Sequence, residues 1–231
     1  MAQATFADGP IAKSIAIACA VMLFVLVIVV SIYLTSSPPI VSSLIHATHN
    51  ASVLSSELRE RGADTSTRFI RNGTGEVEMI EFFESDKIAG EASIEHLRDV
   101  RTVILFTWIV GAICAILIIT LLITSYFKKW WSWLRTTLKF AAWICLAVPL
   151  LLGFIVGVAF DPLFTFFHEI FFPQGNWQFP IDSLLIQTFP EQFWVTIMLI
   201  LLGLIFAFGV LFLLADRLID RFAPHQFSVV E

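Results

Sequence analysis

The sequence predicts an all-α membrane protein, and its composition and its distribution of charge both support that prediction. The chain has 231 residues, of which 58% are hydrophobic and 14% are charged, and its mean hydropathy is +0.85. Charge is absent from four apolar runs, each long enough to cross a hydrocarbon core of about 30 Å, which takes roughly 20 helical residues. We expect four transmembrane helices in one integral membrane domain over residues 1–231, with spans at about 15–34, 102–127, 140–160 and 193–215.

The first apolar run has a second interpretation, as a cleaved signal peptide. Residues 1–13 could form its n-region, and Thr35, Ser36 and Ser37 supply small residues after the apolar stretch. The run is longer than the roughly 7 to 15 residues of a signal-peptide core, so we predict a retained membrane helix.

The short connection between the second and third runs predicts the orientation in the membrane. Residues 128–139 carry four Lys or Arg side chains and no acid, and such loops face the cytoplasm. Both termini are then cytoplasmic in a multi-pass protein. The segments at about 35–101 and 161–192 lie outside.

Neither the cysteines nor recognisable motifs indicate a cofactor. Cys19, Cys114 and Cys145 lie in apolar runs without a C-x-x-C spacing, and no nucleotide-binding loop or H-E-x-x-H motif is present. The net charge of −5, without a basic patch on the outer segments, argues against a nucleic-acid partner. His46 and His49 are three residues apart, which leaves a metal site as an alternative, but no third ligand is evident nearby. We therefore expect no cofactor, metal, nucleotide or nucleic acid.

The first outer segment predicts a surface helix followed by a small β-hairpin. Apolar residues recur at helical spacing over residues 40–61, as in an amphipathic helix on a membrane surface. Residues 62–67 are turn-like. The pair Asn72-Gly73 then separates two short runs at 67–70 and 76–80, and Asn-Gly is the usual signal of a two-residue hairpin turn.

The second outer segment predicts a re-entrant or interfacial loop that handles something apolar. Residues 160–194 are rich in aromatic side chains, carry four carboxylates and contain no Lys or Arg. Four prolines and the pair Gly175-Asn176 divide the segment into short pieces. Irregular backbone at membrane depth must be covered by protein, so we expect a shaped loop and not one long helix.

Four side chains of this loop are candidates for chemistry or substrate binding. His168 lies between pairs of phenylalanines, where charge is costly, so its neutral and basic form should prevail, although histidine also occurs as an ordinary interfacial residue. Asn176 and Trp177 could donate hydrogen bonds to an oxygen that gains charge, and Asp182 follows them. The alternative for Trp177 is an interfacial anchor.

The segment SIEHLRDVR before the second span supplies a second histidine. His96 and Asp99 are three residues apart, so on a helix the carboxylate can reach the imidazole within one turn. A base held by a carboxylate is one interpretation. The other is a solvated turn with an ion pair between Arg98 and an acid.

These two segments carry a resemblance to a known family. The elements F-H-x-x-F-F, N-W-x-F and F-P-x-x-F-W of residues 167–194, together with EHLRDVR at 95–101, resemble the bacterial lipoprotein intramolecular transacylase family of four-helix membrane proteins. The resemblance implies an acyltransferase that moves an acyl chain from the sn-2 position of diacylglyceryl-cysteine to the cysteine α-amino group, leaving a lyso-lipoprotein. It also implies a bacterial cytoplasmic membrane, a site that faces the outer leaflet, and membrane lipid and lipoprotein as partners.

In that family the functional pair is two outer histidines, which carry over onto His96 and His168. We predict His96, oriented by Asp99, as general base and His168 as the group that polarises the carbonyl or protonates the leaving oxygen, with reversed roles left open. Asn176, Trp177 and Asp182 would support the pair or bind substrate. A non-enzymatic scaffold or sensor, or an acyl hydrolase of the outer leaflet, remains an alternative.

Overall fold

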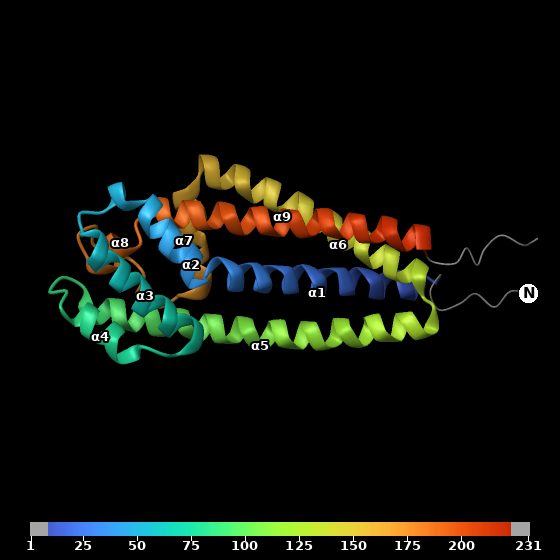
Figure 1. Cartoon of the computed structure of the whole chain (residues 1–231), viewed down its shortest axis with the longest axis horizontal. Helices are drawn as coiled ribbons and strands as arrows, with labels where there is room; N and C mark the ends of the chain where they lie inside the picture. Colours follow the sequence, from blue (N-terminus) through green and yellow to red (C-terminus); the bar gives the residue numbers. More distant parts are fainter. Residues whose placement is uncertain (1–8, 223–231) are drawn as a thin grey trace, which may run out of the picture. The chain divides into compact units, whose positions relative to one another are not determined.

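The computed structural model describes residues 9–222, and within that range the chain is helical with no strand (Figure 1). This confirms the predicted all-α class. The elements are α1 (Pro10–Thr35), α2 (Pro38–Ala47), the 3₁₀ turn η2 (His49–Ala51), α3 (Ser56–Asn72), α4 (Glu76–Glu84), α5 (Gly90–Lys128), α6 (Trp131–Val158), α7 (Phe160–Phe171), α8 (Leu184–Thr188) and α9 (Glu191–Phe222).

Four of these helices, α1, α5, α6 and α9, are long and apolar enough to cross a membrane, and each overlaps one predicted span. The 39 residues of α5 extend about 58 Å at 1.5 Å per residue, well beyond a hydrocarbon core of about 30 Å. Its charged residues all lie before Thr102 or at the final Lys128. The first turns of α5, residues 90–101, therefore precede the part that spans the membrane.

The helices are divided between two compact units. The described part of the first unit comprises residues 9–28, 111–151 and 203–222, which are segments of α1, α5, α6 and α9. Its core joins small residues of α1 to aromatic and aliphatic residues of α5 and α6: Ala12, Ala16, Cys19, Ile118, Trp133, Leu134 and Leu138. The Trp133 indole donates a hydrogen bond of 3.0 Å to the carbonyl of Ala12, so the ring that fills this core is also satisfied as a donor.

A cluster of ion pairs joins α6 to α9 in the first unit. Arg135 donates to Asp216 at 2.8 Å and also to Asp220, and Lys139 lies 3.8 Å from Asp216. Because Asp216 is only 6% exposed, its charge needs these partners. Each of the four charges stands one helical turn from another member on its own helix, so the cluster fixes the register of the two helices.

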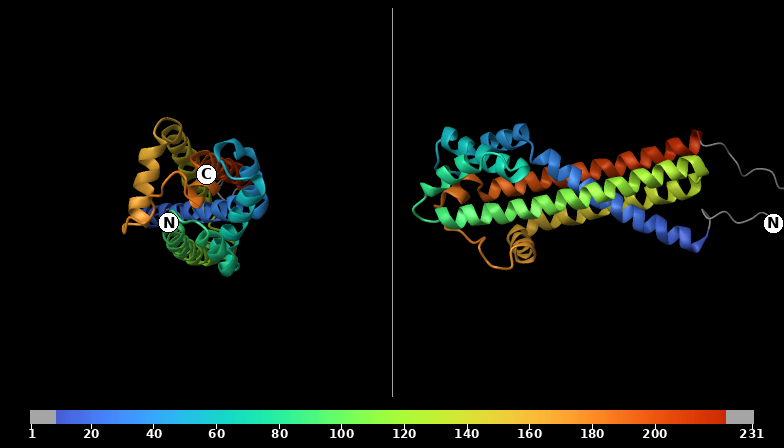
Figure 2. Two further views of the ribbon diagram at one scale, coloured as in Figure 1. Left: turned by 90° about the vertical axis from the view of Figure 1, so that its left-hand side faces the viewer. Right: turned by 90° about the horizontal axis from the view of Figure 1, so that it is seen from below.

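The second unit comprises residues 29–110 and 152–202 and contains all the short helices. Its core includes aromatic and aliphatic residues from α2, α3, α4, α5, α8 and α9: Val41, Leu44, Ile45, Ala63, Phe69, Met79, Phe82, Phe83, Ile94, Leu97, Leu185, Phe189 and Phe193. Figure 2 shows α7 on the opposite side of this unit from α2 and α3. The aromatic helix α7 therefore lies on a different face of this unit from α2 and α3.

The predicted β-hairpin at residues 67–80 is wrong, because both of its arms are helical. Residues 67–72 close α3, and residues 76–84 form α4. Gly73, at φ 72°, ends α3 with its N–H bonded to the carbonyl of Phe69. An Asn-Gly pair supplies a positive φ equally to a hairpin turn and to a helix end, so the pair alone could not distinguish the two structures.

The predicted surface helix at 40–61 is two helices, and the turn predicted at 62–67 lies inside α3. The α-helix is interrupted between Ala47 and Ser56, and the two resulting helices, α2 and α3, pack against each other. Gly62 permits close packing of α3 against α4, since a Cβ placed there would lie 2.6 Å from the ring of Phe82. The glycine is required by close approach within the helix and not by a turn.

A buried arginine of α3 ties the short helices of the second unit together. Arg59 is 1% exposed and donates from Nε to the carbonyl of Thr188 at 2.9 Å and from Nη1 to the carbonyl of Ile45 at 2.9 Å. Its Nη2 donates to the hydroxyl of Thr48 at 2.7 Å. Two of these acceptors lie in the last turns of α8 and α2, where unpaired carbonyls and the helix dipole favour a cation.

Replacing Arg59 with leucine should destabilise the second unit strongly. The carbonyls of Thr188 and Ile45 would stay buried without donors, and an unsatisfied buried group costs about 1–3 kcal/mol. We expect a loss of about 2–5 kcal/mol in the free energy of unfolding, measured by tryptophan fluorescence of the detergent-solubilised protein. Arg61→Leu, an exposed arginine on the same helix, is the control and should stay within about 0.5 kcal/mol. Equal effects of the two substitutions would contradict this role.

Candidate active site

His168 lies in the last turns of α7, and a backbone carbonyl fixes its ring. Its Nδ1 lies 2.8 Å from the carbonyl oxygen of Phe164, one helical turn earlier. A carbonyl only accepts, so Nδ1 must carry the hydrogen and donate it. In the neutral ring the lone pair is therefore on Nε2, and that nitrogen is the basic atom of His168.

Aromatic rings surround His168. The ring centroids of Phe164, Trp177 and Phe167 lie 4.0, 4.9 and 5.4 Å from that of the imidazole, and the side chain is 8% exposed. Burial lowers the pKa of His168 below its ordinary value, while the hydrogen bond to Phe164 acts in the opposite direction. The ring is thus neutral at physiological pH, as expected from the sequence.

His96 stands on the first turns of α5, next to His168. The two imidazole centroids are 6.1 Å apart and the rings are stacked with an interplanar angle of 23°. Phe172 and Phe179 cover His96 at 4.8 and 5.5 Å. Burial, and next the proximity of His168, lower the pKa of His96 to about 4, against opposing contributions from Asp99 and Asn176. Both rings are therefore uncharged near neutral pH.

Asp99 contacts the aromatic loop directly and not His96. Its Oδ2 accepts a hydrogen bond of 2.6 Å from Asn176 Nδ2 and one of 2.9 Å from Gln174 Nε2. Gly175, between these two donors, has φ 80°, a conformation that glycine adopts without strain and that lets both flanking side chains reach one carboxylate. The carboxylate therefore fastens the loop to α5.

Of the two remaining candidate residues, Trp177 contacts the histidine pair and Asp182 does not. Trp177 lies against His168, with the two rings tilted by 35° to each other. Asp182 is exposed before α8 and takes part in none of the hydrogen bonds or ion pairs found among residues 9–222. Phe164 and Gln174 were not singled out from the sequence. The i−4 spacing of Phe164 from His168 is the signal that indicates the first of these contacts.

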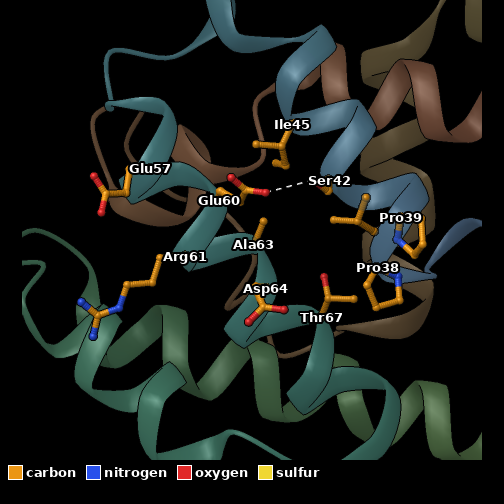
Figure 3. Close-up of a pocket in the computed structure, with 11 residues that line it drawn as sticks. Pro38, Pro39, Ser42, Ile45, Glu57, Glu60, Arg61, Ala63, Asp64 and Thr67 are labelled. Carbon is orange, nitrogen blue, oxygen red and sulfur yellow. Dashed lines mark hydrogen bonds between the residues drawn. The ribbon is translucent and has the colours of Figure 1, made fainter.

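A groove of about 540 Å³ between α2 and α3 is separate from the histidine pair (Figure 3). Its floor is apolar, with Val41 and Ile45, and its rim is acidic, where Glu60 accepts a hydrogen bond of 3.0 Å from Ser42. His46 lies 3.7 Å from Glu60, and His49 Nδ1 lies 3.1 Å from the carbonyl of His46. Within residues 9–222, no three His, Cys, Asp or Glu side chains are grouped to hold a metal ion.

Fold and site together define a class: a multi-pass integral membrane protein with a dehydrated histidine pair just beyond the end of one membrane-spanning segment. The family described as lipoprotein intramolecular transacylase Lit matches this chain over residues 15–194. The chain therefore belongs to the lipoprotein intramolecular transacylase family. It is an acyltransferase, and the reaction of its family is intramolecular transacylation of lipoproteins.

Solved structures with the same fold support the architecture. The membrane-integral Lit of Bacillus cereus superposes with a TM-score of 0.76 at 14% identity, covering 91% of this chain and 95% of that one. Two variants of that protein, in which one histidine is replaced by arginine or by alanine, give TM-scores of 0.67 and 0.56 at 14% and 13% identity. They cover 90% and 91% of this chain and 91% and 94% of theirs. The comparison with curated proteins gives no significant match.

The lowered pKa of His96 makes the folded protein less stable in acid. The unfolded chain binds a proton near pH 6.5 and the folded chain only near pH 4, so stability is full above the first value and falls as pH drops toward the second. We expect unfolding free energy to fall by about 2 kcal/mol between pH 7.5 and pH 5 through His96 alone. Thermal melts at both values should show this loss in the wild type and a smaller one in His96→Gln. An identical loss in the variant would disprove the assignment.

Proposed function

We propose that His96 and His168 catalyse transfer of the sn-2 acyl chain of a diacylglyceryl-cysteine to the α-amino group of the same cysteine. The C–N amide bond forms, the C–O ester bond breaks, and the amine proton ends on the glyceryl oxygen. The observation that carries this proposal is the stacked, buried histidine pair, with centroids 6.1 Å apart, at the edge of the apolar stretch of α5.

The reaction needs no energy source and no enzyme nucleophile. Exchange of an ester for an amide is downhill, so no nucleotide is consumed. The ester and the amine belong to one molecule, so holding them in the reactive conformation supplies the proximity advantage without a covalent enzyme intermediate. The protein has to orient the substrate, move one proton and exclude water.

We assign the proton transfer to Nε2 of His168. Its Nδ1–H is already donated to the Phe164 carbonyl, and that bond strengthens when the ring becomes an imidazolium. His168 takes the amine proton as the nitrogen attacks and returns it to the leaving glyceryl oxygen. This reverses the order predicted from the sequence, since His96 has a pKa of about 4 and is the weaker proton carrier.

His96 orients the amine while remaining neutral. A nitrogen lone pair on its ring accepts one N–H of the amine, and that hydrogen stays in the amide product. The other N–H then points at His168. A neutral amine offers two hydrogens, so two adjacent imidazoles match the need to hold one and remove the other.

The aromatic rings would bind the acyl chains and exclude water from the reacting carbonyl. Attack by water would release a free fatty acid in place of the amide. Because His96 and His168 are 7% and 8% exposed, a bound ester must displace part of the cover. The half-buried Trp177, which packs on His168, is the side chain in the best position to move.

We infer that the site faces the outer leaflet and that both termini are cytoplasmic. The basic loop around residues 128–139 supports this orientation. The exposed apolar side chains of α7, among them Phe166 and Ile170, would then lie against lipid at the interface. The partners are a diacylglyceryl-modified lipoprotein and membrane lipid, with no nucleotide and no nucleic acid.

Mass spectrometry of lipoprotein amino termini tests the reaction. In a bacterium that makes diacylglyceryl lipoproteins, expression of this chain should move one acyl group from glycerol to nitrogen with no change in total mass. Fragmentation distinguishes the two isomers. His96→Ala and His168→Ala should lower the yield at least about 100-fold, since a positioned acid–base group contributes about 10²–10⁴-fold.

His46→Ala and His49→Ala are the matched controls, because both histidines lie outside the pair and should leave the yield unchanged. Free fatty acid in place of the amide would identify a hydrolase. An unmodified diacylglyceryl peptide with wild-type protein in the membrane would favour a scaffold. Full activity in a site variant would remove that histidine from the mechanism.

The pH dependence of kcat/KM separates the amine from the histidine. The rate should rise with pH up to about 8 as the substrate amine loses its proton. Because the pKa of His168 is lowered, the loss of kcat/KM that comes from protonation of His168 should appear only below about pH 6.5. The pH profile should become steeper there. A histidine limb above pH 7 would show that the catalytic ring is charged at rest, contrary to the proposal.

A further inference from the structure

Two polar atoms in the site are buried and lack a hydrogen bond among the described residues: Nδ1 of His96 and Oδ1 of Asn176. A buried polar atom without a partner costs free energy, so native structures rarely leave two in one place. Neither atom is paired in the structure, but Asp99 holds the Asn176 side chain one helical turn from His96, and that side chain acts on the pKa of His96 in the upward direction, so the amide lies near the ring. The two unpaired atoms are complementary, because Nδ1 of a neutral imidazole can donate a hydrogen and an amide oxygen accepts one.

Asp99 determines which end of the Asn176 amide faces His96. An ionised carboxylate only accepts, so the amide atom 2.6 Å from Asp99 Oδ2 is the nitrogen. The choice between amide oxygen and nitrogen is normally ambiguous, and here the carboxylate fixes it. With the nitrogen bound to Asp99, the oxygen at the other end of the amide is available only as an acceptor.

We propose that Asn176 is a positioning residue for His96: its Oδ1 accepts a hydrogen bond from Nδ1–H of His96. Asp99 accepts from Nδ2 of Asn176 and so holds the amide in the orientation that this bond requires. This inference rests on the proposed function of the histidine pair. It places the lone pair of His96 on Nε2, as the Phe164 carbonyl does for His168. Both rings then present a basic Nε2 to the substrate amine. His96 can accept one N–H of the amine while His168 removes the other hydrogen.

Placing a neutral amide between carboxylate and imidazole has a chemical reason. A carboxylate bonded directly to Nδ1–H favours the imidazolium and raises the pKa of the ring. Asn176 orients the ring without that charge, so His96 remains a neutral acceptor beside His168. Asp99 then determines the tautomer of His96 indirectly, through Asn176.

Gly175 makes this chain of contacts possible. Its φ of 80° lets Asn176 and Gln174 point at the same carboxylate, and a Cβ at this glycine would meet nothing within 4 Å. The requirement at this position is therefore conformational and not steric. The loop is built so that two amides converge on Asp99, of which one continues to the histidine.

The tautomer of His96 can be read directly in the full-length protein. In detergent-solubilised protein labelled with ¹⁵N-histidine, the two ring nitrogens of a neutral imidazole give distinct shifts, and His96 is assigned by its loss in His96→Gln. At pH 7.5 the wild type should show the Nδ1–H form. Asn176→Leu should shift His96 toward the Nε2–H form and reduce kcat about 10-fold or more, with KM changed less than about 3-fold.

Two further variants separate positioning from simple support of the loop. Asn176→Asp brings a carboxylate to the ring, so its activity should be low at pH 7 and recover at higher pH, with the acid limb displaced upward by about one pH unit. Gln174→Ala removes the other donor to Asp99 and should change kcat less than about 3-fold with the His96 tautomer intact.

An unchanged His96 tautomer in folded Asn176→Leu, or a wild-type acid limb in Asn176→Asp, would overturn the inference. The tautomer readout needs no turnover, so it stands even where the transacylase assay fails. Conversely, full transacylation by His96→Ala would sink the proposed function and leave the His96–Asn176 contact to be judged by its spectrum alone.

Discussion

The burial of two imidazoles against each other, in a setting of aromatic rings, is the constraint on which the functional part of this structure depends. Each ring loses its hydration, which lowers its pKa, and His168 further lowers the pKa of His96. Neutral hydrogen-bond partners keep them in place: the Phe164 carbonyl for His168 and, by our inference, the Asn176 amide for His96. The result is a pair of weak bases that stay uncharged in an apolar setting, where charge is expensive.

The same preference for neutral partners recurs in the rest of the second unit. Arg59 is a fully buried cation held by two carbonyls and a hydroxyl, and Arg101 donates from Nη1 to the carbonyl of Phe69 at 2.8 Å. Both arginines donate to carbonyls in the last turns of helices, where the helix dipole favours a cation. Short helices have many such ends, so a unit built from them can retain the buried Arg59 without a matching acid.

The first unit satisfies its buried charge in a different way. There Asp216 is paired with Arg135 and Lys139, and small residues of α1 receive the aromatic side chains of α6. Close packing of small and large residues and paired polar groups are what hold helices together where lipid competes for apolar contact. The first unit thus holds long helices in register, and the second unit contains the short helices around the candidate site.

The sequence by itself determined the features that depend on composition along the chain. Uncharged runs of about 20 residues located the four long helices, and the phenylalanines around His168, together with a family resemblance at residues 95–101 and 167–194, singled out His96 and His168. Local signals were weaker: Asn72-Gly73 predicted a hairpin where Gly73 ends a helix, because both structures need the same positive φ. Only the tertiary structure decided which groups meet. Asp99 is one turn from His96 in sequence, yet it binds Asn176, 77 residues away, because the loop after α7 folds back onto α5. Spacing along a helix limits which contacts are possible, and long-range packing chooses among them.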